Sequence, residues 1–422
     1  MKYFKYLFFS CLLFAPLWGF SQETKPPVLD GTEGEVVRAE TVDSTGASTH
    51  KMQLNEFDGP LSTLRFSGGF LYEFAGFTQD EISKEQVTTE NNFKVRDLRF
   101  VISGKFKTKR DISWKIGFMY DGNEKSWFMR ETGVMFGLPK IKGHIFIGRT
   151  KEGYSMSKIM NGYSIWNLER MAAIDVIPIL SDGIKYMGYF KKPHIFWNLG
   201  AFANWTAKEQ SFATFQYHFV TRVAWLPIYT DVNKPVLHIG ASYRYGKVKD
   251  GKINVKSKPE VSGSPNFVET GSFSADYNNS LGGEIYFRSG KLLLGTEYHA
   301  HKFASASAAN PVFFGGEAFV AYMFTGEVKP YYSSTGIFGF IKVKKSIYNG
   351  GWGAFEGMLR FTNLELTDGN LEGGDFWRIT PAFNWYPSDN FRLFVAYGYC
   401  VLDRYGKQGT SNIFQVRGMI YM

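Results

Sequence analysis

Sixteen segments with alternating apolar and polar side chains follow one another from residue 62 to the end of the chain. In GAFEGMLRFTNLELTDG at 353–369, Phe355, Leu359 and Phe361 alternate with Glu356 and Arg360. Such alternation predicts β-strands, because successive side chains of a strand leave opposite faces. The predicted strands are 62–74, 97–106, 112–120, 127–136, 143–150, 183–190, 194–205, 217–225, 236–246, 281–290, 291–301, 312–324, 353–369, 376–386, 391–399 and 413–422.

The first residues predict export from the cytoplasm. Lys2 and Lys5 precede the apolar run LFFSCLLFAPLWGF, and a polar stretch follows. This order is typical of a signal peptide, here residues 1–21 with cleavage after Ser21, and a retained membrane anchor is the alternative. Residues 22–60 are polar and aperiodic, so we expect a flexible periplasmic leader before a barrel domain at 61–422. The mature chain would keep Cys400 alone, which excludes an intrachain disulfide.

The connections between the predicted strands also alternate. Those after even-numbered strands are mostly short (KTKRD, FKKP, SGK, PSDN), whereas 75–94, 150–182 and 246–280 follow odd-numbered strands and are long. Short turns on one side and long loops on the other are typical of outer-membrane β-barrels. The sequence therefore predicts an all-β fold, a sixteen-stranded antiparallel transmembrane β-barrel with both chain ends in the periplasm. The segment 326–352 is the exception, since it is long but begins on the periplasmic side.

A barrel gives each face of the strands a role. We expect Phe355, Leu359 and Phe361 to face lipid, and Glu356 and Arg360 to face a water-filled lumen. Aromatic residues near strand ends would form the interfacial girdles: Tyr72, Tyr120, Trp205, Trp225, Trp385 and Tyr399. A soluble secreted β-sandwich array is the alternative that alternation alone leaves open.

The predicted lumen face is basic. Arginine and lysine outnumber acidic residues by roughly two to one on the more polar strand faces, and a positive excess in a low-dielectric tube attracts anions. The candidate anion-binding residues of the lumen are Arg65, Lys115, Arg222, Arg244, Arg360 and Arg378. For any one of them, pairing with a neighbouring glutamate in the wall is the simpler interpretation.

Two long loops complete the prediction. Residues 150–181 are too apolar for an external loop, so we expect them to fold into the barrel as a constriction loop carrying Lys151, Lys158 and Arg170. The lysine-rich loop 246–280 is predicted to be solvated, with an anion-gathering vestibule as the alternative.

Catalytic and metal-binding patterns are weak. The histidines are scattered, and His299 and His301 share a strand face without a complete ligand set. No nucleophile turn, phosphate-binding loop or dinucleotide fingerprint is evident, so we expect no enzyme, no metal and no cofactor. The formal charge of +9 would suit anions or anionic lipid, and export makes nucleic acid the least suitable partner.

Three stretches resemble the phosphate-selective porin O and P family: 336–369 with its basic segment and GGWGAFE, 377–399 with NWYPSDNFR, and 147–173 with IGRTKEGYS and NLERMAA. The resemblance extends over about 62–422 and implies a sixteen-stranded outer-membrane barrel that is a homotrimer and passes anions. Within the matching stretches lie Lys151, Arg170, Lys342 and Lys344.

Together these observations predict a passive porin for small anions, with phosphate as one candidate, in the outer membrane of a Gram-negative bacterium. Outer-membrane lipid would be the other partner. A general diffusion porin for small polar nutrients and a plugged structural or adhesive barrel are the alternatives.

Overall fold

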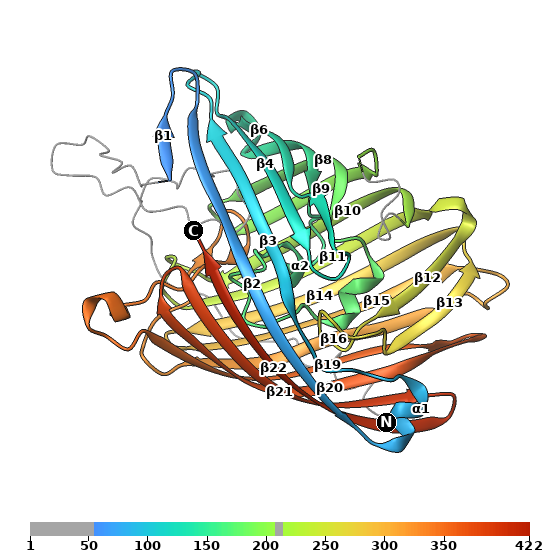
Figure 1. The fold of residues 1–422 in the computed structure, drawn as a ribbon. Helices are drawn as coiled ribbons and strands as arrows, with labels where there is room; N and C mark the ends of the chain where they lie inside the picture. The colour runs from blue at the N-terminus through green and yellow to red at the C-terminus, as the bar shows by residue number, and fades with distance from the viewer. Residues whose placement is uncertain (1–54, 207–213) are drawn as a thin grey trace.

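The chain forms one closed antiparallel β-barrel with sixteen strand positions (Figure 1). The computed structural model describes residues 55–206 and 214–422. The barrel closes where β22 pairs with β2, from Gly69 opposite Tyr421 to Gln79 opposite Ser411. The strands are β2 (Thr63–Gln79), β3 (Asn92–Lys105), β4 (Ile112–Asp121), β5 (Ser126–Met129), β6 (Thr132–Leu138), β7 (Gly143–Thr150), β8 (Ser181–Phe190), β9 (Ile195–Ala203), β10 (Phe215–Ile228), β11 (Val236–Val248), β14 (Tyr277–Ser289), β15 (Leu292–Ala304), β16 (Val312–Met323), β19 (Ala354–Asp368), β20 (Leu371–Ser388), β21 (Phe391–Arg404) and β22 (Lys407–Tyr421).

The predicted strands all coincide with barrel strands, and the predicted fold class is confirmed. The signal peptide, 1–21, and most of the leader lie outside the described residues. Within the rest of the leader, β1 (Glu56–Asp58) pairs with the start of β2. None of the described helices is long and apolar enough to span a bilayer. β1 and the C-terminus lie at the end of the barrel that carries the short turns, which makes this end periplasmic (Figure 1).

Two irregularities interrupt the wall near its start. The fourth strand position is shared by β5 and β6, which pair with opposite ends of β4. Arg130 and Glu131 fill the break, and the backbone N–H of Arg130 donates to the carbonyl of Gly117 at 2.8 Å. In β3, a bulge makes Arg96 an extra residue between Val95 and Asp97. Breaks and bulges of this kind re-aim side chains, so consecutive residues can point to the same side of the wall.

The two faces of β19 are oriented as the alternation predicts. Leu359 is 50% exposed and Phe361 38% exposed on the lipid side, whereas Glu356 and Arg360 turn inward. The expectation that these two inward side chains face water is wrong, because they are only 2% and 3% exposed. Packed protein fills the barrel interior next to them.

Three segments supply this filling. The inward loop, residues 151–180, contains α2 (Met156–Ile159) and η3 (Ala172–Val176) and lies inside the barrel, as predicted. The outer loop, residues 249–276, contains η4 (Lys249–Gly251), β12 (Lys252–Ser257) and β13 (Val268–Ser274). The periplasmic segment, residues 324–353, contains β17 (Tyr331–Tyr332), β18 (Ile337–Phe338) and η5 (Ile347–Asn349). The barrel also carries α1 (Glu81–Gln86) and η2 (Pro139–Ile141) in its connections.

The outer loop corrects a prediction. We expected a solvated loop, but Val255, Phe267 and Val268 are at most 3% exposed. They join a buried apolar cluster with Ile174 of η3 and Phe376 of β20. Its lysines at 252 and 256 do remain exposed, so the loop has one wet side and one packed side.

Candidate functional site

The barrel interior divides into two regions. On the interior face of β10 to β21, apolar side chains of the wall pack against the inward loop and the periplasmic segment. At the centre, Trp166 of the inward loop stacks on Phe319 of β16 with ring centroids 4.5 Å apart and meets Phe338 of the periplasmic segment edge-on at 6.2 Å. We call this region the filled half. Its described apolar residues form an internal hydrophobic core.

Four predicted lumen residues lie in the filled half: Arg222, Arg244, Arg360 and Arg378, which are 0–3% exposed. Their guanidinium groups contact partners in the protein. Arg222 pairs with Glu284 at 2.6 Å, and Arg244 pairs with Glu152 at 2.7 Å.

The other two arginines hold the outer loop. Arg360 pairs with Glu317 and with Glu260 of the outer loop, both at 2.7 Å. Arg378 donates to the carbonyl oxygen of Pro259 at 2.6 Å.

Arginines of the filled half therefore hold the inserted segments in place. Arg392 donates to the carbonyls of Ile165 and Trp166 at 2.6 and 2.9 Å, and Arg222 donates to the carbonyl of Gly336 at 3.1 Å. Irregular backbone inside a barrel needs such partners, since a buried carbonyl without a donor is costly. A role for Arg222, Arg244, Arg360 or Arg378 in anion binding stays a prediction.

The interior face of β2 to β6 is different, and we call it the open wall. Several of its charged side chains reach water: 23% of Arg65, 19% of Arg96, 13% of Arg99 and 14% of Glu131 are exposed, whereas Glu73, Asp97 and Lys115 are buried. Arg130, in the break between β5 and β6, is also partly exposed. Water therefore has access to charged groups on this side of the barrel.

Three arginines gather where the inward loop approaches the open wall. Arg99 pairs with Asp97 and lies 4.2 Å from the ring centroid of Tyr163. Arg130 interacts electrostatically with Arg99, and both act on Arg170 of the inward loop. Burial, reinforced by these two guanidinium groups, lowers the pKa of Arg170 to about 10, so that it stays charged at neutral pH. We call Arg99, Arg130 and Arg170 the arginine cluster.

The arginine cluster carries excess positive charge. Arg170 donates to the carbonyls of Ser157 and Met160, both at 2.8 Å, and Arg130 donates to the sulfur of Met119 at 3.5 Å. Within the described residues, neither Arg130 nor Arg170 forms an ion pair with a carboxylate. Glu131 and Glu169 also act on Arg130 and Arg170, but these two carboxylates are themselves paired with Lys115 and Arg96. Basic groups therefore outnumber carboxylates in this partly water-accessible space.

A glycine lets the inward loop come close to this cluster. A Cβ atom on Gly162 would lie 3.3 Å from each terminal nitrogen of Arg99. Such a contact is tight, so a larger residue here would push against the guanidinium group. Gly162 thus helps to set the width of the space beside Arg99.

The remaining predicted residues lie outside the arginine cluster. Arg65 is 3.7 Å from Glu56 near the periplasmic end, and Lys115 pairs with Glu131 at 3.0 Å. Lys151 donates to the carbonyls of Ile159 and Met160 and is buried. Lys158 is 4.0 Å from Glu152 and is also buried. Of the predicted site residues, Arg170 is the one that joins the arginine cluster.

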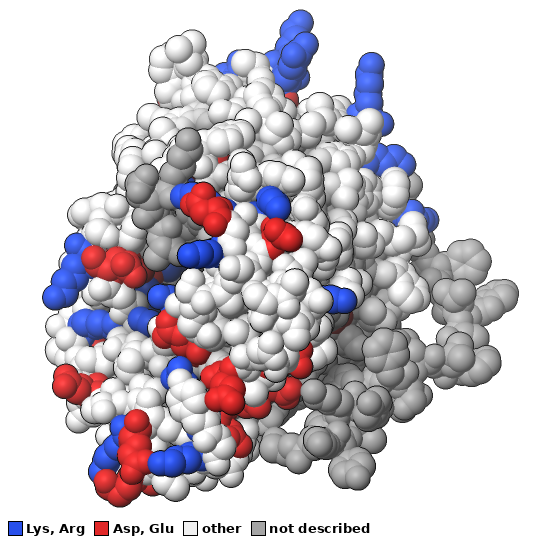
Figure 2. Space-filling view, turned by 90° about the vertical axis from the view of Figure 1, so that its right-hand side faces the viewer, with Lys and Arg blue, Asp and Glu red and all other residues white. Residues whose placement is uncertain are grey.

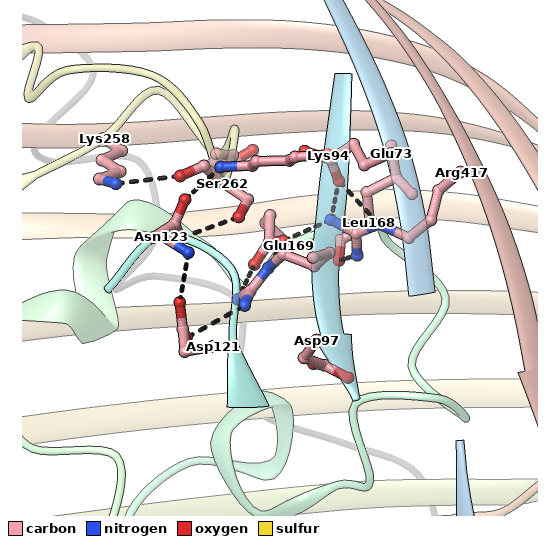
Figure 3. A network of polar contacts seen from close by, with 12 residues as sticks. Glu73, Lys94, Asp97, Asp121, Asn123, Leu168, Glu169, Lys258, Ser262 and Arg417 are labelled. Atoms are coloured by element: carbon pink, nitrogen blue, oxygen red, sulfur yellow. Dashed lines mark hydrogen bonds and ion pairs between the residues drawn. The ribbon is translucent and has the colours of Figure 1, made fainter. Parts of the chain in front are cut away.

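A polar network joins the open wall to the filled half at the outer end (Figure 3). Glu169 of the inward loop accepts from Arg96 at 2.8 Å and pairs with Arg417 of β22. Burial alone would raise the pKa of Glu169, but Arg96 and Arg417 hold it well below its ordinary value. The inward loop is thereby fixed between two strands of the wall.

The same network reaches the outer loop. Asn123 accepts from Lys94 and donates to the hydroxyl of Ser262 at 2.9 Å, and Lys258 donates to the carbonyl of Ser262 at 2.9 Å (Figure 3). Burial and the nearby Arg96 lower the pKa of Lys258. Basic groups therefore extend from the outer mouth towards the arginine cluster.

The sequence did not indicate Arg96 or Arg130 as site residues. Arg96 enters the interior through the bulge in β3, and Arg130 does so through the break between β5 and β6. In a regular strand only one of two adjacent residues faces the interior. The adjacent charged residues Arg130 and Glu131 could therefore have indicated a break in the strand. No group of three or more histidine, cysteine or acidic residues in the described part of the chain is arranged to hold a metal ion.

A closed barrel with lipid-facing apolar residues outside and a charged, water-accessible wall inside is the architecture of the outer-membrane porins. The sequence pattern of the phosphate-selective porin O and P family matches residues 66–421, so the chain belongs to that family. Its location is the outer membrane of a Gram-negative bacterium. An uncharacterized protein of Caulobacter vibrioides is 30% identical over 182 residues, which are 42% of this chain and 36% of that protein. The match thus spans about a third of the relative's length.

Solved structures share the fold at low sequence identity. OmpT of Vibrio cholerae is 13% identical with a TM-score of 0.54, covering 87% of this chain and 100% of OmpT. The channel DcaP of Acinetobacter baumannii is 8% identical with a TM-score of 0.55, covering 87% and 100%. An anion-selective porin from Comamonas acidovorans is 10% identical with a TM-score of 0.53, covering 85% and 100%. At these identities the likeness concerns the barrel fold.

Proposed function

We propose that this protein is a passive channel for small anions, and that the anions move along the open wall past the arginine cluster. The observation that carries the proposal is the gathering of three guanidinium groups beside water, of which Arg99 pairs with Asp97 while Arg130 and Arg170 form no carboxylate ion pair within the described residues. In a narrow low-dielectric space such an excess raises the local anion concentration. Family membership supports the same conclusion.

Phosphate is the anion that we propose as the preferred cargo. A guanidinium group offers a planar pair of donors that matches two oxygens of a tetrahedral oxyanion. Arg130 and Arg170 keep N–H groups without a carboxylate partner, and Arg99 lies within reach of both charges. A passing oxyanion can therefore exchange part of its hydration shell for donors from two strands and one loop.

The test is the reversal potential of single channels in planar bilayers under a potassium chloride gradient. We expect a strong anion preference in dilute salt that fades in concentrated salt, because the Debye length falls to about 3 Å at about 1 M. Arg99→Gln combined with Arg130→Gln should remove most of the preference. Lys252→Gln with Lys256→Gln, which changes two exposed lysines of the outer loop, is the matched control and should leave the preference intact. A cation-selective wild-type channel would refute the proposal.

Phosphate preference has a separate readout. Added inorganic phosphate should partly block the chloride current of the wild type, and the block should disappear in the Arg99→Gln, Arg130→Gln variant. A chloride current that is indifferent to phosphate would remove phosphate as the preferred cargo and leave a general anion channel.

We also propose that the channel is a homotrimer, as the family resemblance implies. One of the similar Vibrio cholerae OmpT structures is described as a trimer form. Sedimentation in a density-matched detergent would test this, and a monomer under conditions that preserve conductance would refute it.

A further inference from the structure

The periplasmic segment contains a part that turns away from the barrel interior. Ile347, Tyr348 and Trp352 are 43%, 80% and 81% exposed, although Tyr331 and Phe338 of the same segment are buried. We call residues 342–352 the rim protrusion; η5 lies within it, in the orange part of the chain that extends from the barrel in Figure 1. Large apolar side chains exposed together on an ordered element indicate a surface with a partner.

The rim protrusion is rigidly closed by its own backbone. The N–H groups of Gly351 and Gly353 donate to the carbonyls of Ser346 and Lys345 at 2.9 and 3.2 Å. Gly350 and Gly353 have φ of 69° and 79°, a conformation that glycine adopts without steric cost. Tyr348 and Trp352 are therefore held outward by a folded turn.

The rim protrusion continues the lipid-facing surface of the barrel. The indole N–H of Trp385 donates to the carbonyl of Trp352 at 2.7 Å. Trp385 in turn stacks with Phe355, and Phe355 stacks with the exposed Phe383. Tryptophan and tyrosine prefer this level of a bilayer, where the hydrocarbon meets the headgroups. Trp352 thus lies at the periplasmic edge of the lipid-facing band.

The charged side chains of the rim protrusion itself are all positive, and two neighbouring carboxylates, Asp389 and Glu327, accept from the backbone N–H groups of Val343 and Lys344. Lys342, Lys344 and Lys345 are exposed, and residues 342–352 contain no aspartate or glutamate. A Cβ atom on Gly326 would lie 3.3 Å from the ammonium nitrogen of Lys344 and 3.8 Å from that of Lys291, so two cations approach one point. Within the described residues, these four lysines form no ion pair. Such a group of like charges is complementary to an anionic partner.

The short turns also carry lysines, and two lysines at this end pair with carboxylates, Lys105 with Asp111 and Lys107 with Asp58, both at 2.7 Å. Exposed lysines lie in the turns after β3, β6, β8, β10 and β14: Lys109, Lys140, Lys191, Lys234 and Lys291. At the extracellular end, Lys84 pairs with Glu81 at 2.7 Å and Lys407 with Glu85 at 2.8 Å. Figure 2 shows acidic and basic side chains intermingled on that side.

We propose that the rim protrusion docks on the anionic phospholipid headgroups of the periplasmic leaflet. Lys342, Lys344 and Lys345 contact the phosphates, and Tyr348 and Trp352 insert at the interface. Lysines close to an anionic membrane surface strengthen such binding. This lipid site is separate from the arginine cluster, so the proposal does not depend on anion transport.

The first experiment compares lipid retention by native mass spectrometry, with phosphatidylglycerol and phosphatidylcholine of the same acyl chains as probes. The wild type should retain several-fold more phosphatidylglycerol. Lys342→Gln, Lys344→Gln and Lys345→Gln together should reduce this retention to the phosphatidylcholine level. The matched control changes Lys84, Lys252 and Lys256 to Gln and should keep it. Equal retention of both lipids by the wild type, or full retention by the rim variant, would overturn the proposal.

The second experiment measures depth. A fluorescent label on Tyr348→Cys should be quenched by brominated phospholipid in vesicles, whereas a label on Glu85→Cys at the extracellular end should not be. Cys400 is buried and does not compete for the label. An unquenched label at 348 would overturn the proposal, and loss of oligomer in the lysine variant with unchanged lipid retention would assign the surface to a second copy instead.

Discussion

The filled half and the open wall are built from strands of the same kind, yet charged side chains reach water in the second and not in the first. Along β19, Glu356, Met358 and Arg360 turn inward and are at most 6% exposed. Along β3, Arg96 and Arg99 also turn inward, and 19% and 13% of their side chains reach water. The difference comes from the inserted segments, which pack against one side of the barrel. In a barrel, strand alternation determines whether a side chain points inward or outward. Loops that are distant in sequence determine whether an inward side chain is exposed to water.

The largest expected difference between the two regions is in stability. Arg360→Ala removes the common partner of Glu260 and Glu317 and leaves two buried carboxylates, so unfolding in urea should be easier by roughly 3–5 kcal/mol. Arg130→Ala leaves no carboxylate unpaired and should change stability by about 0.5 kcal/mol or less. Similar losses in both variants would show that the two regions are not energetically distinct.

Two substitutions at adjacent residues, one lipid-facing and one inward-facing, test the difference between the open wall and the filled half in each strand. On the lipid side, Phe100→Arg in β3 and Leu359→Arg in β19 should each cost about 2–4 kcal/mol. On the inner side the two strands should differ. Val101→Arg is next to accessible space and should fold, whereas Met358→Arg places an unpaired charge in the internal core and should not. Yields of heat-modifiable, folded barrel would measure all four, and a well-folded Met358→Arg variant would contradict the filled half.

Deleting residues 156–168 would remove the centre of the internal core. Single-channel conductance should rise, because Met156, Ile165 and Trp166 no longer occupy the barrel. Thermal stability should fall at the same time, since Arg392 and Arg417 lose their carbonyl partners. Unchanged conductance in a folded deletion variant would mean that residues 156–168 do not limit the ion path.

The smallest expected effect concerns pH at the outer mouth. Burial lowers the pKa of Lys258, so this lysine loses its charge at a lower pH than an ordinary lysine, whose pKa is about 10.4. Arg170, whose pKa is about 10, also loses charge as the pH rises towards that value. Anion preference should therefore weaken in both proteins, and the wild type should show an additional small decline that Lys258→Gln lacks. An identical alkaline decline in Lys258→Gln would assign the titration to another group.

The sequence predicted the barrel well because each strand carries its own signal. It predicted where the strands lie, the orientation of Leu359 and Glu356, and the entry of the inward loop, whose apolar residues had no other place to pack. Strand ends were less accurate, as at β20, which begins at Leu371 and not at 376. The hydrogen-bonded strands extend beyond the bilayer. Neither face has to be apolar there, so the apolar–polar alternation is lost.

The environment of the interior residues could not be predicted in the same way. Arg222 looks like a lumen residue in its strand, but it is buried because Gly336, more than a hundred positions later, accepts its hydrogen bond. The outer loop looked solvated because its lysines are conspicuous, whereas Phe267 packs against Phe376 of a distant strand. Such contacts depend on tertiary packing, and no local pattern encodes them.

The break between β5 and β6 has a consequence for how this wall tolerates change. Inserting or deleting one residue in a continuous strand turns every following side chain to the opposite face. Residues 130 and 131 lie between two ladders that pair separately with β4, so a change of length there is absorbed before β6 begins. Both lineage variation and protein engineering can therefore change the position of Arg130 by insertion or deletion, while the rest of the barrel keeps its register.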